Sequence, residues 1–122
     1  MITFIVHADI KPGATDRFQD AVYRTTRFIA EHEPDFASYV HYDLDASQAF
    51  FVNVVSDSDA LALHFALAPD NEAHPEMMSA CDVTSVQICG DLAPEVEQLV
   101  AAMNPQRLTF HDGTFGRRVQ PA

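Results

Sequence analysis

Residues 53–74, the stretch around which the chain is organised, read NVVSDSDALALHFALAPDNEAH. The stretch begins in a predicted strand, residues 49–55, which is apolar, aromatic and β-branched apart from Asn53. The polar run Ser-Asp-Ser-Asp that follows is rich in side chains that accept hydrogen bonds at a helix start. Residues 60–68 are apolar at every position except His64, which predicts a helix buried on more than one side. A buried imidazole needs a polar partner, a ligand or water, so a site is expected here first.

A second imidazole follows this predicted helix. Pro69 closes the helix, and a polar loop leads to His74, which precedes Pro75. Asn53, His64 and His74 are therefore expected close to one apolar wall. Each also has a structural interpretation: His64 as a core imidazole satisfied by a backbone carbonyl or by Asn53, and His74 as a helix cap. Asn53 would then be a strand residue that bonds the neighbouring helix cap.

Outward from this stretch, the chain shows further strand and helix patterns. Strands are expected where apolar residues alternate, and helices where they recur at i, i+3 and i+4. The predicted strands are residues 2–10, 36–44, 49–55 and 83–90, with a short edge strand at 107–110. The first predicted helix begins at Thr15 and ends before Pro34. Two shorter helices are predicted at residues 60–68 and 75–80. The last predicted helix begins at residues 91–94 and ends at Asn104.

This order of elements predicts the fold class. The series β-α-β-β-α-β matches the ferredoxin-like split β-α-β motif of α+β proteins, with a four-stranded antiparallel sheet. A length of 122 residues is that of one domain. Residues 1–122 are therefore expected to form a single ferredoxin-like domain, in which residues 92–122 add a C-terminal helix and an arm.

The predicted sheet has a second apolar face. Helices in this arrangement cover one face, yet either register of the strands carries Ile, Val, Phe or Tyr. A broad apolar face in contact with water marks an association surface. The sheet is therefore expected to pack against a second copy of itself, as a homodimer.

Composition excludes several classes of partner. The formal net charge is −11 with only 7 Lys and Arg residues, whereas nucleic acids and anionic membrane surfaces attract basic patches. No apolar run is long enough for a transmembrane helix, and no signal peptide is apparent at the N-terminus. Two cysteines do not form a secreted disulfide framework, so a cytoplasmic location is expected.

The chain resembles the antibiotic biosynthesis monooxygenase family of the dimeric α+β-barrel superfamily over roughly residues 1–91. The resemblance rests on the strand 2–10 followed by Lys-Pro-Gly, on the hairpin, and mainly on the segment from Asn53 to His64. Family members carry an acidic residue eleven positions before a motif that ends in histidine, and Asn53 stands at that position here. The resemblance implies a cofactor-independent oxygenase that oxidises phenolic, quinol or anthrone-like aromatics with O₂, in a pocket between sheet and helices.

A haem-binding and haem-degrading branch of the same superfamily fits less well. That branch uses an asparagine on the first strand, a tryptophan on the second long helix, and a histidine ten residues later as the iron ligand. His74 matches the last position, but His64 stands at the tryptophan position and His7 at the asparagine position. Haem degradation is therefore disfavoured.

The expected chemistry needs few groups. Reaction of a phenol or anthrone with O₂ begins with removal of a proton, and histidine is the natural base near neutral pH. His64 is the candidate base, with Asn53 and His74 as polar groups that orient the substrate or hold an oxyanion. Residues expected to bind the substrate are His7, Phe51, Phe65 and Met78.

Other functions stay open on the sequence alone. The same residues would serve a non-catalytic dimeric ligand-binding or stress-response protein of this fold, since fold does not fix function. Whether the protein is an enzyme is therefore open. The resemblance implies no cofactor, and no tight His-x-His or His-x₃-His motif supports a metal site.

Overall fold

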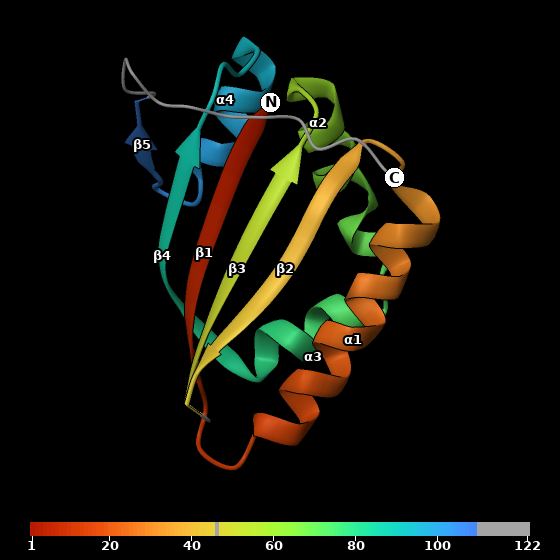
Figure 1. The fold of residues 1–122 in the computed structure, drawn as a ribbon, viewed down its shortest axis with the longest axis vertical. Helices are drawn as coiled ribbons and strands as arrows, with labels where there is room; N and C mark the ends of the chain where they lie inside the picture. Colours follow the sequence, from red (N-terminus) through yellow and green to blue (C-terminus); the bar gives the residue numbers. More distant parts are fainter. Residues whose placement is uncertain (46, 110–122) are drawn as a thin grey trace, which may run out of the picture.

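The computed structural model describes residues 1–45 and 47–109 of the chain (Figure 1). Ten elements lie within these residues. These are β1 (Ile2–Ile10), α1 (Thr15–His32), β2 (Phe36–Leu44), β3 (Gln48–Val55), α2 (Ser58–Leu67), the 3₁₀ turn η1 (Ala68–Asp70), α3 (Ala73–Ser79), β4 (Cys81–Cys89), α4 (Pro94–Ala101) and β5 (Gln106–Leu108).

The strands form one mixed sheet in the order β2-β3-β1-β4-β5. The first four are antiparallel, and β5 adds to the edge parallel to β4. The predicted ferredoxin-like α+β class is therefore confirmed, with β5 as a fifth strand. The edge strand predicted at residues 107–110 begins one residue earlier, at Gln106. Residue 110 and the remainder of the predicted C-terminal arm, residues 111–122, lie outside the described residues.

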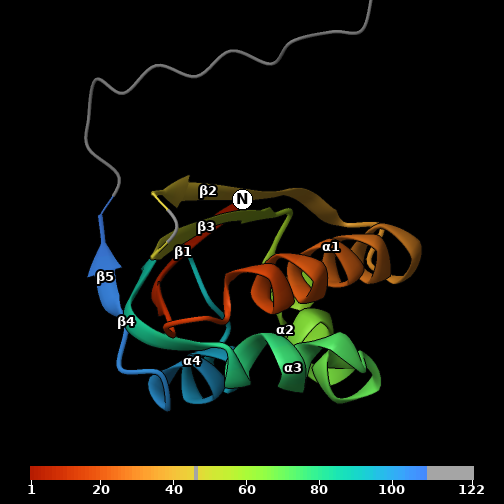
Figure 2. The same cartoon turned by 90° about the horizontal axis from the view of Figure 1, so that it is seen from below.

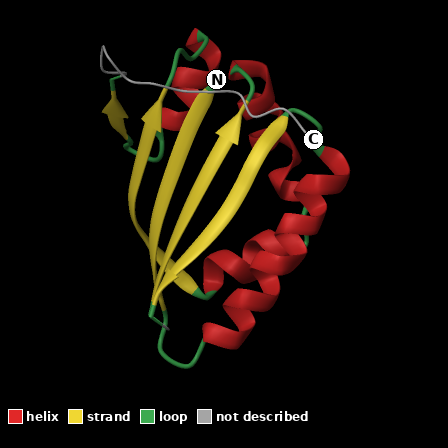
Figure 3. Cartoon of the chain, in the orientation of Figure 1, coloured by secondary structure: helices red, strands yellow, loops and turns green. Residues whose placement is uncertain are grey.

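The helices cover one face of the sheet, as the view along the strands shows (Figure 2). Figure 3 distinguishes the helices and strands by colour in the orientation of Figure 1. The sequence explains this coverage because the buried residues of β1 all lie on one face of the strand, namely Ile2, Phe4, Ala8 and Ile10. The buried residues of α1 recur at helical spacing and form one stripe, Phe18, Ala21, Val22, Thr25 and Ile29. No helix of the described residues is both long and apolar enough to cross a membrane.

Helix boundaries follow local capping chemistry. The helix α2 begins at Ser58, two residues before the predicted start, because the side chain of Asp57 accepts a hydrogen bond from the Ala60 N–H at 2.9 Å. Pro69 ends α2 but allows the 3₁₀ turn. The helix α3 begins at Ala73 rather than at Pro75, since a proline in the first turn gives up an N–H that has no partner there anyway.

The strand β4 also departs from the expected pattern. Its pairing with β1 shifts register between His7 and Ala8, so that Val83 lies opposite Ala8. Thr84 is left over at this bulge, and its hydroxyl donates to the His7 carbonyl at 3.1 Å. The bulge turns Val83 and Val86 toward the same face, which strict alternation does not allow.

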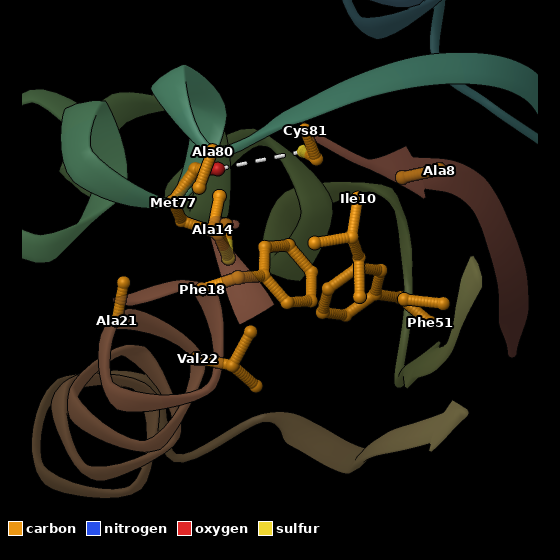
Figure 4. Packing of buried hydrophobic residues seen from close by; sticks show 11 residues of the cluster. Ala8, Ile10, Ala14, Phe18, Ala21, Val22, Phe51, Met77, Ala80 and Cys81 are labelled. Carbon is orange, nitrogen blue, oxygen red and sulfur yellow. Dashed lines mark hydrogen bonds between the residues drawn. The ribbon is translucent and has the colours of Figure 1, made fainter. Parts of the chain in front are cut away.

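The apolar core beneath the sheet consists of two clusters. One packs the start of α1 and the end of α3 against the sheet around Phe18 and Phe51 (Figure 4). Its Cys81 thiol donates to the Met77 carbonyl at 3.4 Å. The other cluster packs α2 and α4 against the opposite ends of the strands around Leu61 and Ile88. Val6 contacts both clusters, and the space between them holds the candidate site.

Candidate functional site

A cavity of about 420 Å³ lies between the sheet and the helices, with walls from both apolar clusters. Ligand pockets in proteins typically measure ~300–1,000 Å³. The bulge in β4 places both Val83 and Val86 on its wall. Most of the lining is apolar, and its polar side chains are Thr25, Glu33, Tyr39, Asn53, His64, Asn71 and His74.

The contact between Glu33 and His64 joins two helices at this cavity. Glu33 follows the last turn of α1 and is only 5% exposed, and His64 lies in the last turn of α2. The Nδ1 atom of His64 lies 2.9 Å from Oε1 of Glu33. A carboxylate only accepts hydrogen bonds, so Nδ1 carries the hydrogen. Within residues 1–45 and 47–109, Nε2 of His64 has no protein partner, so it can exchange a proton with a ligand.

Aromatic rings surround the His64 imidazole. The ring of Phe36 meets it edge-on with centroids 5.1 Å apart, and the Phe65 ring lies 5.9 Å away. Such rings hold the imidazole plane and reduce the access of water. The hydrogen bond between His64 and Glu33 is therefore partly protected from competing water.

Asn53 is a buried polar residue of the cavity wall. The residue is 3% exposed, and its Nδ2 donates to the carbonyl oxygen of Phe4 on the neighbouring strand at 3.1 Å. Its Oδ1 is fully buried and has no hydrogen-bond partner within residues 1–45 and 47–109. Because protein atoms enclose this oxygen, a contact with a ligand stays a prediction.

His74 is a half-buried imidazole in the first turn of α3. Burial lowers the pKa of His74 below its ordinary value of 6.5, and the nearby His64 lowers this pKa further. Desolvation and repulsion between like charges both disfavour the protonated form. His74 is therefore neutral at neutral pH and offers the cavity a hydrogen bond rather than a charge.

Tyr39 extends from β2 into the same cavity. Burial raises the pKa of its phenol far above the ordinary value of 10.0, and the charge of Glu33 raises it further. The hydroxyl therefore remains protonated at physiological pH. It has no hydrogen-bond partner in the part of the chain that the structure describes.

Asn71 has a structural role in the cavity wall. Its Nδ2 donates to the Thr25 hydroxyl at 3.1 Å, and its Oδ1 accepts from the Ala73 N–H at 3.1 Å. These bonds tie the loop before α3 to α1 and use the polar atoms of its amide. We therefore assign no ligand contact to Asn71.

The structure brings most of the predicted site residues together. Those that line the cavity are Asn53, His64, His74, Phe51, Phe65 and Met78. Their polar contacts differ from the expected ones, because Asn53 bonds the Phe4 carbonyl rather than a helix cap, and His64 bonds Glu33 rather than Asn53. The catalytic and binding roles of these residues stay predictions.

His7 lies elsewhere, on the sheet face that the helices leave open. Its ring stacks on Phe50 with centroids 4.3 Å apart, and its Nε2 lies 3.1 Å from Oε1 of Gln48. Successive residues of a strand point to opposite faces, and the inward neighbours of His7 line the cavity. His7 is therefore not among the residues that line this cavity, and a substrate contact of His7 stays a prediction.

Glu33 is the functional candidate that sequence reasoning missed. The helix pattern places Glu33 only at the polar end of the first helix, directly before Pro34. A usable signal was present, because a carboxylate at a helix C-terminus is unfavourable for the helix dipole. Glu33 also follows Ile29 by four residues, so it continues the buried face of the helix. A buried acid at an unfavourable position points to a distant partner.

The described residues contain no group of three or more His, Cys, Asp and Glu side chains placed to hold a metal ion. Sulfur atoms of Met77, Met78, Met103 and Cys81 do line the cavity. Thioether side chains adapt to irregular apolar ligands and contact aromatic rings favourably. We therefore assign these residues to the apolar wall.

Fold and cavity together define the class: an α+β protein with a ferredoxin-like sheet and a mainly apolar site beneath it. No family model and no curated protein matches the sequence. Solved structures do match the fold. MupZ from Pseudomonas fluorescens superposes with a TM-score of 0.79 at 18% identity, over 95% of this chain and 88% of MupZ.

Two further structures carry names that describe oxygenases. A protein named antibiotic biosynthesis monooxygenase matches with a TM-score of 0.61 at 26% identity, over 77% of this chain and 100% of its own. SnoaB from Streptomyces nogalater, named a cofactor-independent oxygenase, has a TM-score of 0.63 at 18% identity, over 75% of this chain and 93% of SnoaB. The predicted resemblance to antibiotic biosynthesis monooxygenases is confirmed at the level of the fold.

Proposed function

We propose that the protein is a cofactor-independent monooxygenase that oxidises a phenolic, quinol or anthrone-like aromatic with O₂. The observation that carries this proposal is the contact of partly buried His64 with buried Glu33 at a mainly apolar cavity. The pair supplies a base, and the apolar walls bind an aromatic body and exclude water. The names of the solved oxygenases with this fold support the choice of O₂ as the second substrate.

The pair would act as one general base. Glu33 accepts the hydrogen of His64 Nδ1 and so fixes the tautomer in which Nε2 carries the free electron pair. When Nε2 takes a proton from the substrate, the carboxylate stabilises the imidazolium that forms. The neutral state of His74 avoids a second positive charge beside it.

The remaining chemistry follows from the substrate anion, which is a better electron donor than the neutral molecule. For an anthrone, O₂ converts a CH₂ group into a carbonyl, and the second oxygen atom leaves with the two hydrogens as water. The reaction needs no reductant. The role of the chain is to remove the first proton and to hold the ring in place.

A homodimer is the proposed assembly. On the face opposite the helices, the register of β2, β3 and β1 sets Val40, Val52 and Ile5 side by side. Tyr42 and Phe50 are neighbours in the next row. Such an apolar row across three strands is an association surface. The free cysteines Cys81 and Cys89 agree with a proposed cytoplasmic location.

Oxygen uptake by the purified protein tests the proposal. With anthrone or a hydroquinone as substrate, the wild type should consume O₂ above the buffer rate, and His64→Ala should lose about 100- to 10,000-fold in rate. His32→Ala is the matched control, because His32 is exposed at the end of α1 and should leave the rate unchanged.

Two results would reject the catalytic function. One is no oxidation of any quinol or anthrone above the buffer rate, and the other is full activity of a folded His64→Ala variant. If the same aromatics bind without turnover, the non-catalytic ligand-binding function takes its place.

A further inference from the structure

All methionines of the chain except Met1 line the candidate cavity, namely Met77, Met78 and Met103. Their exposure to solvent differs. Met77 packs in the apolar cluster around Phe18 and is 9% exposed (Figure 4), whereas Met78 is 41% exposed and Met103 is intermediate. A side chain that lines a cavity and is also exposed lies where the cavity meets the solvent. Met78 is therefore placed at the entrance.

Val83 marks the same entrance. This residue lines the cavity from β4 and is 42% exposed, and β4 follows directly on α3, which carries Met78. Two apolar side chains on consecutive elements thus border the solvent. An aromatic molecule that enters between them contacts Met78, and thioethers contact aromatic rings favourably. Met78 should therefore contribute to the affinity of the cavity for aromatic ligands.

We propose that Met78 is an oxidation site, and that its conversion to the sulfoxide by hydrogen peroxide lowers the affinity of the cavity for aromatic molecules. The Met78 sulfur attacks one oxygen of the peroxide, and an S–O bond forms as the O–O bond breaks. Sulfur gives up two electrons, and the second oxygen leaves as water with both hydrogens. A polar side chain then stands in place of an apolar one.

The sulfoxide weakens binding in either position that it can take. On the cavity wall, its oxygen loses hydrogen bonds to water that an aromatic ring does not replace. Turned out to the solvent, it leaves the wall without an apolar side chain. Methionine sulfoxide reductases reverse the oxidation. Met78 is thus a reversible peroxide-sensitive switch at the entrance.

The cysteines are less suited to this role. Cys81 lines the cavity but is buried, and burial raises the pKa of its thiol. The thiolate is the form that reacts with peroxide, so Cys81 is protected. Cys89 is not among the residues that line the cavity. The effect of peroxide on ligand binding is therefore assigned to Met78.

The proposed function offers a source of the oxidant. A hydroquinone that loses two electrons and two protons to O₂ gives a quinone and hydrogen peroxide, so an incomplete turnover releases peroxide at the cavity. The switch itself requires only that the cavity binds an aromatic molecule. Peroxide added from outside therefore tests the switch without any turnover.

Binding of 2-naphthol before and after peroxide treatment tests the proposal. Fluorescence titration under nitrogen, after gel filtration has removed the peroxide, should show about tenfold weaker binding to the treated wild type. Met78→Leu keeps an apolar side chain of similar volume and should bind equally before and after treatment. Met77→Leu is the matched control, and peroxide should weaken its binding as in the wild type. Met78→Gln imitates the sulfoxide and should bind weakly without treatment.

Tandem mass spectrometry of peptides identifies the oxidised residues. Met78 should oxidise faster than its neighbour Met77, because susceptibility follows exposure. Met1 is 84% exposed and lies outside the cavity wall, so it should oxidise as well. Bound 2-naphthol should slow the oxidation of Met78 and leave that of Met1 unchanged. If Met78→Leu does not fold, this protection decides in its place.

Three results would overturn the assignment of Met78. They are unchanged affinity for 2-naphthol in wild type oxidised at Met78, an equal loss of affinity in treated Met78→Leu, and no binding of 2-naphthol to the untreated protein. The proposed function fails separately. Absence of O₂ uptake together with peroxide-sensitive binding would reject the oxygenase and leave the switch in place.

Discussion

At the scale of single residues, the site depends on a contact that joins positions 31 residues apart, Glu33 and His64. Neither residue would have its proposed role without the other. Glu33 without His64 would be a buried unpaired charge, and His64 without Glu33 would have no fixed tautomer. A substitution of Glu33 therefore tests the orientation of the imidazole, whereas a substitution of His64 tests the base itself.

Glu33→Gln keeps the shape of the side chain and removes its charge. We expect kcat for O₂ uptake to fall about 10- to 100-fold, the usual effect of removing a partner that orients a histidine. The loss should be smaller than that of His64→Ala, because the base is still present. Glu31→Gln is the matched control, since Glu31 is an exposed residue of the same helix end. A rate equal to the wild type in Glu33→Gln would show that the carboxylate does not orient the base.

His74 gives a prediction for stability against pH. Its pKa is lowered in the folded state, so below its ordinary value of 6.5 the unfolded chain binds more protons than the folded one. The free energy of unfolding therefore falls as the pH drops from 6.5 through the lowered folded pKa. In His74→Gln this contribution should vanish. Urea unfolding of both proteins between pH 7.5 and about pH 5 measures the difference, and parallel curves would contradict the assignment.

At the scale of elements, the sequence predicts what local patterns determine. The buried stripe of α1 from Phe18 to Ile29 and the alternation of β1 are periodic and therefore readable. The convergence of Asn53, His64 and His74 on one cavity also follows from chain order, since a strand and the helix after it are adjacent.

Other features depend on long-range packing and have no local signature. The bulge in β4 follows from its pairing with β1, and it decides that Val83 faces the cavity. The partner of Glu33 depends on how α1 and α2 lie together. His7 stands on the opposite sheet face by simple alternation, and this separation from the cavity can be predicted from the strand pattern of β1.

The start of α2 is a testable element because this helix carries His64. Asp57 caps it through the bond to the Ala60 N–H, so Asp57→Ala should lower the free energy of unfolding by about 1 kcal/mol. Asp59→Ala, in the exposed first turn, removes only a charge near the helix start and should cost about 0.5 kcal/mol or less. Chemical denaturation of both variants provides the comparison. An equal loss in the two would assign the effect to charge rather than to the cap.

At the scale of the whole molecule, the sheet face opposite the helices determines assembly. Val52 lies at its centre, between Ile5 and Val40. We expect the wild type to sediment as a dimer at micromolar concentration and Val52→Asp to sediment as a folded monomer, because a buried unpaired carboxylate is costly. Leu99→Asp, on the exposed side of α4, should remain a dimer. A monomeric wild type in analytical ultracentrifugation would contradict the proposed interface.

The division of the apolar core into two clusters has a consequence for motion. Each cluster anchors different helices, and Val6 is the residue seen to pack against both. Local opening of α3 and of α4 is then expected to be nearly independent in the free protein. A ligand that touches both walls would join the two events, so amide hydrogens in these distant helices would slow their exchange together. Ligand binding would thus be detectable as coupled hydrogen exchange in α3 and α4, even where the mean structure stays the same.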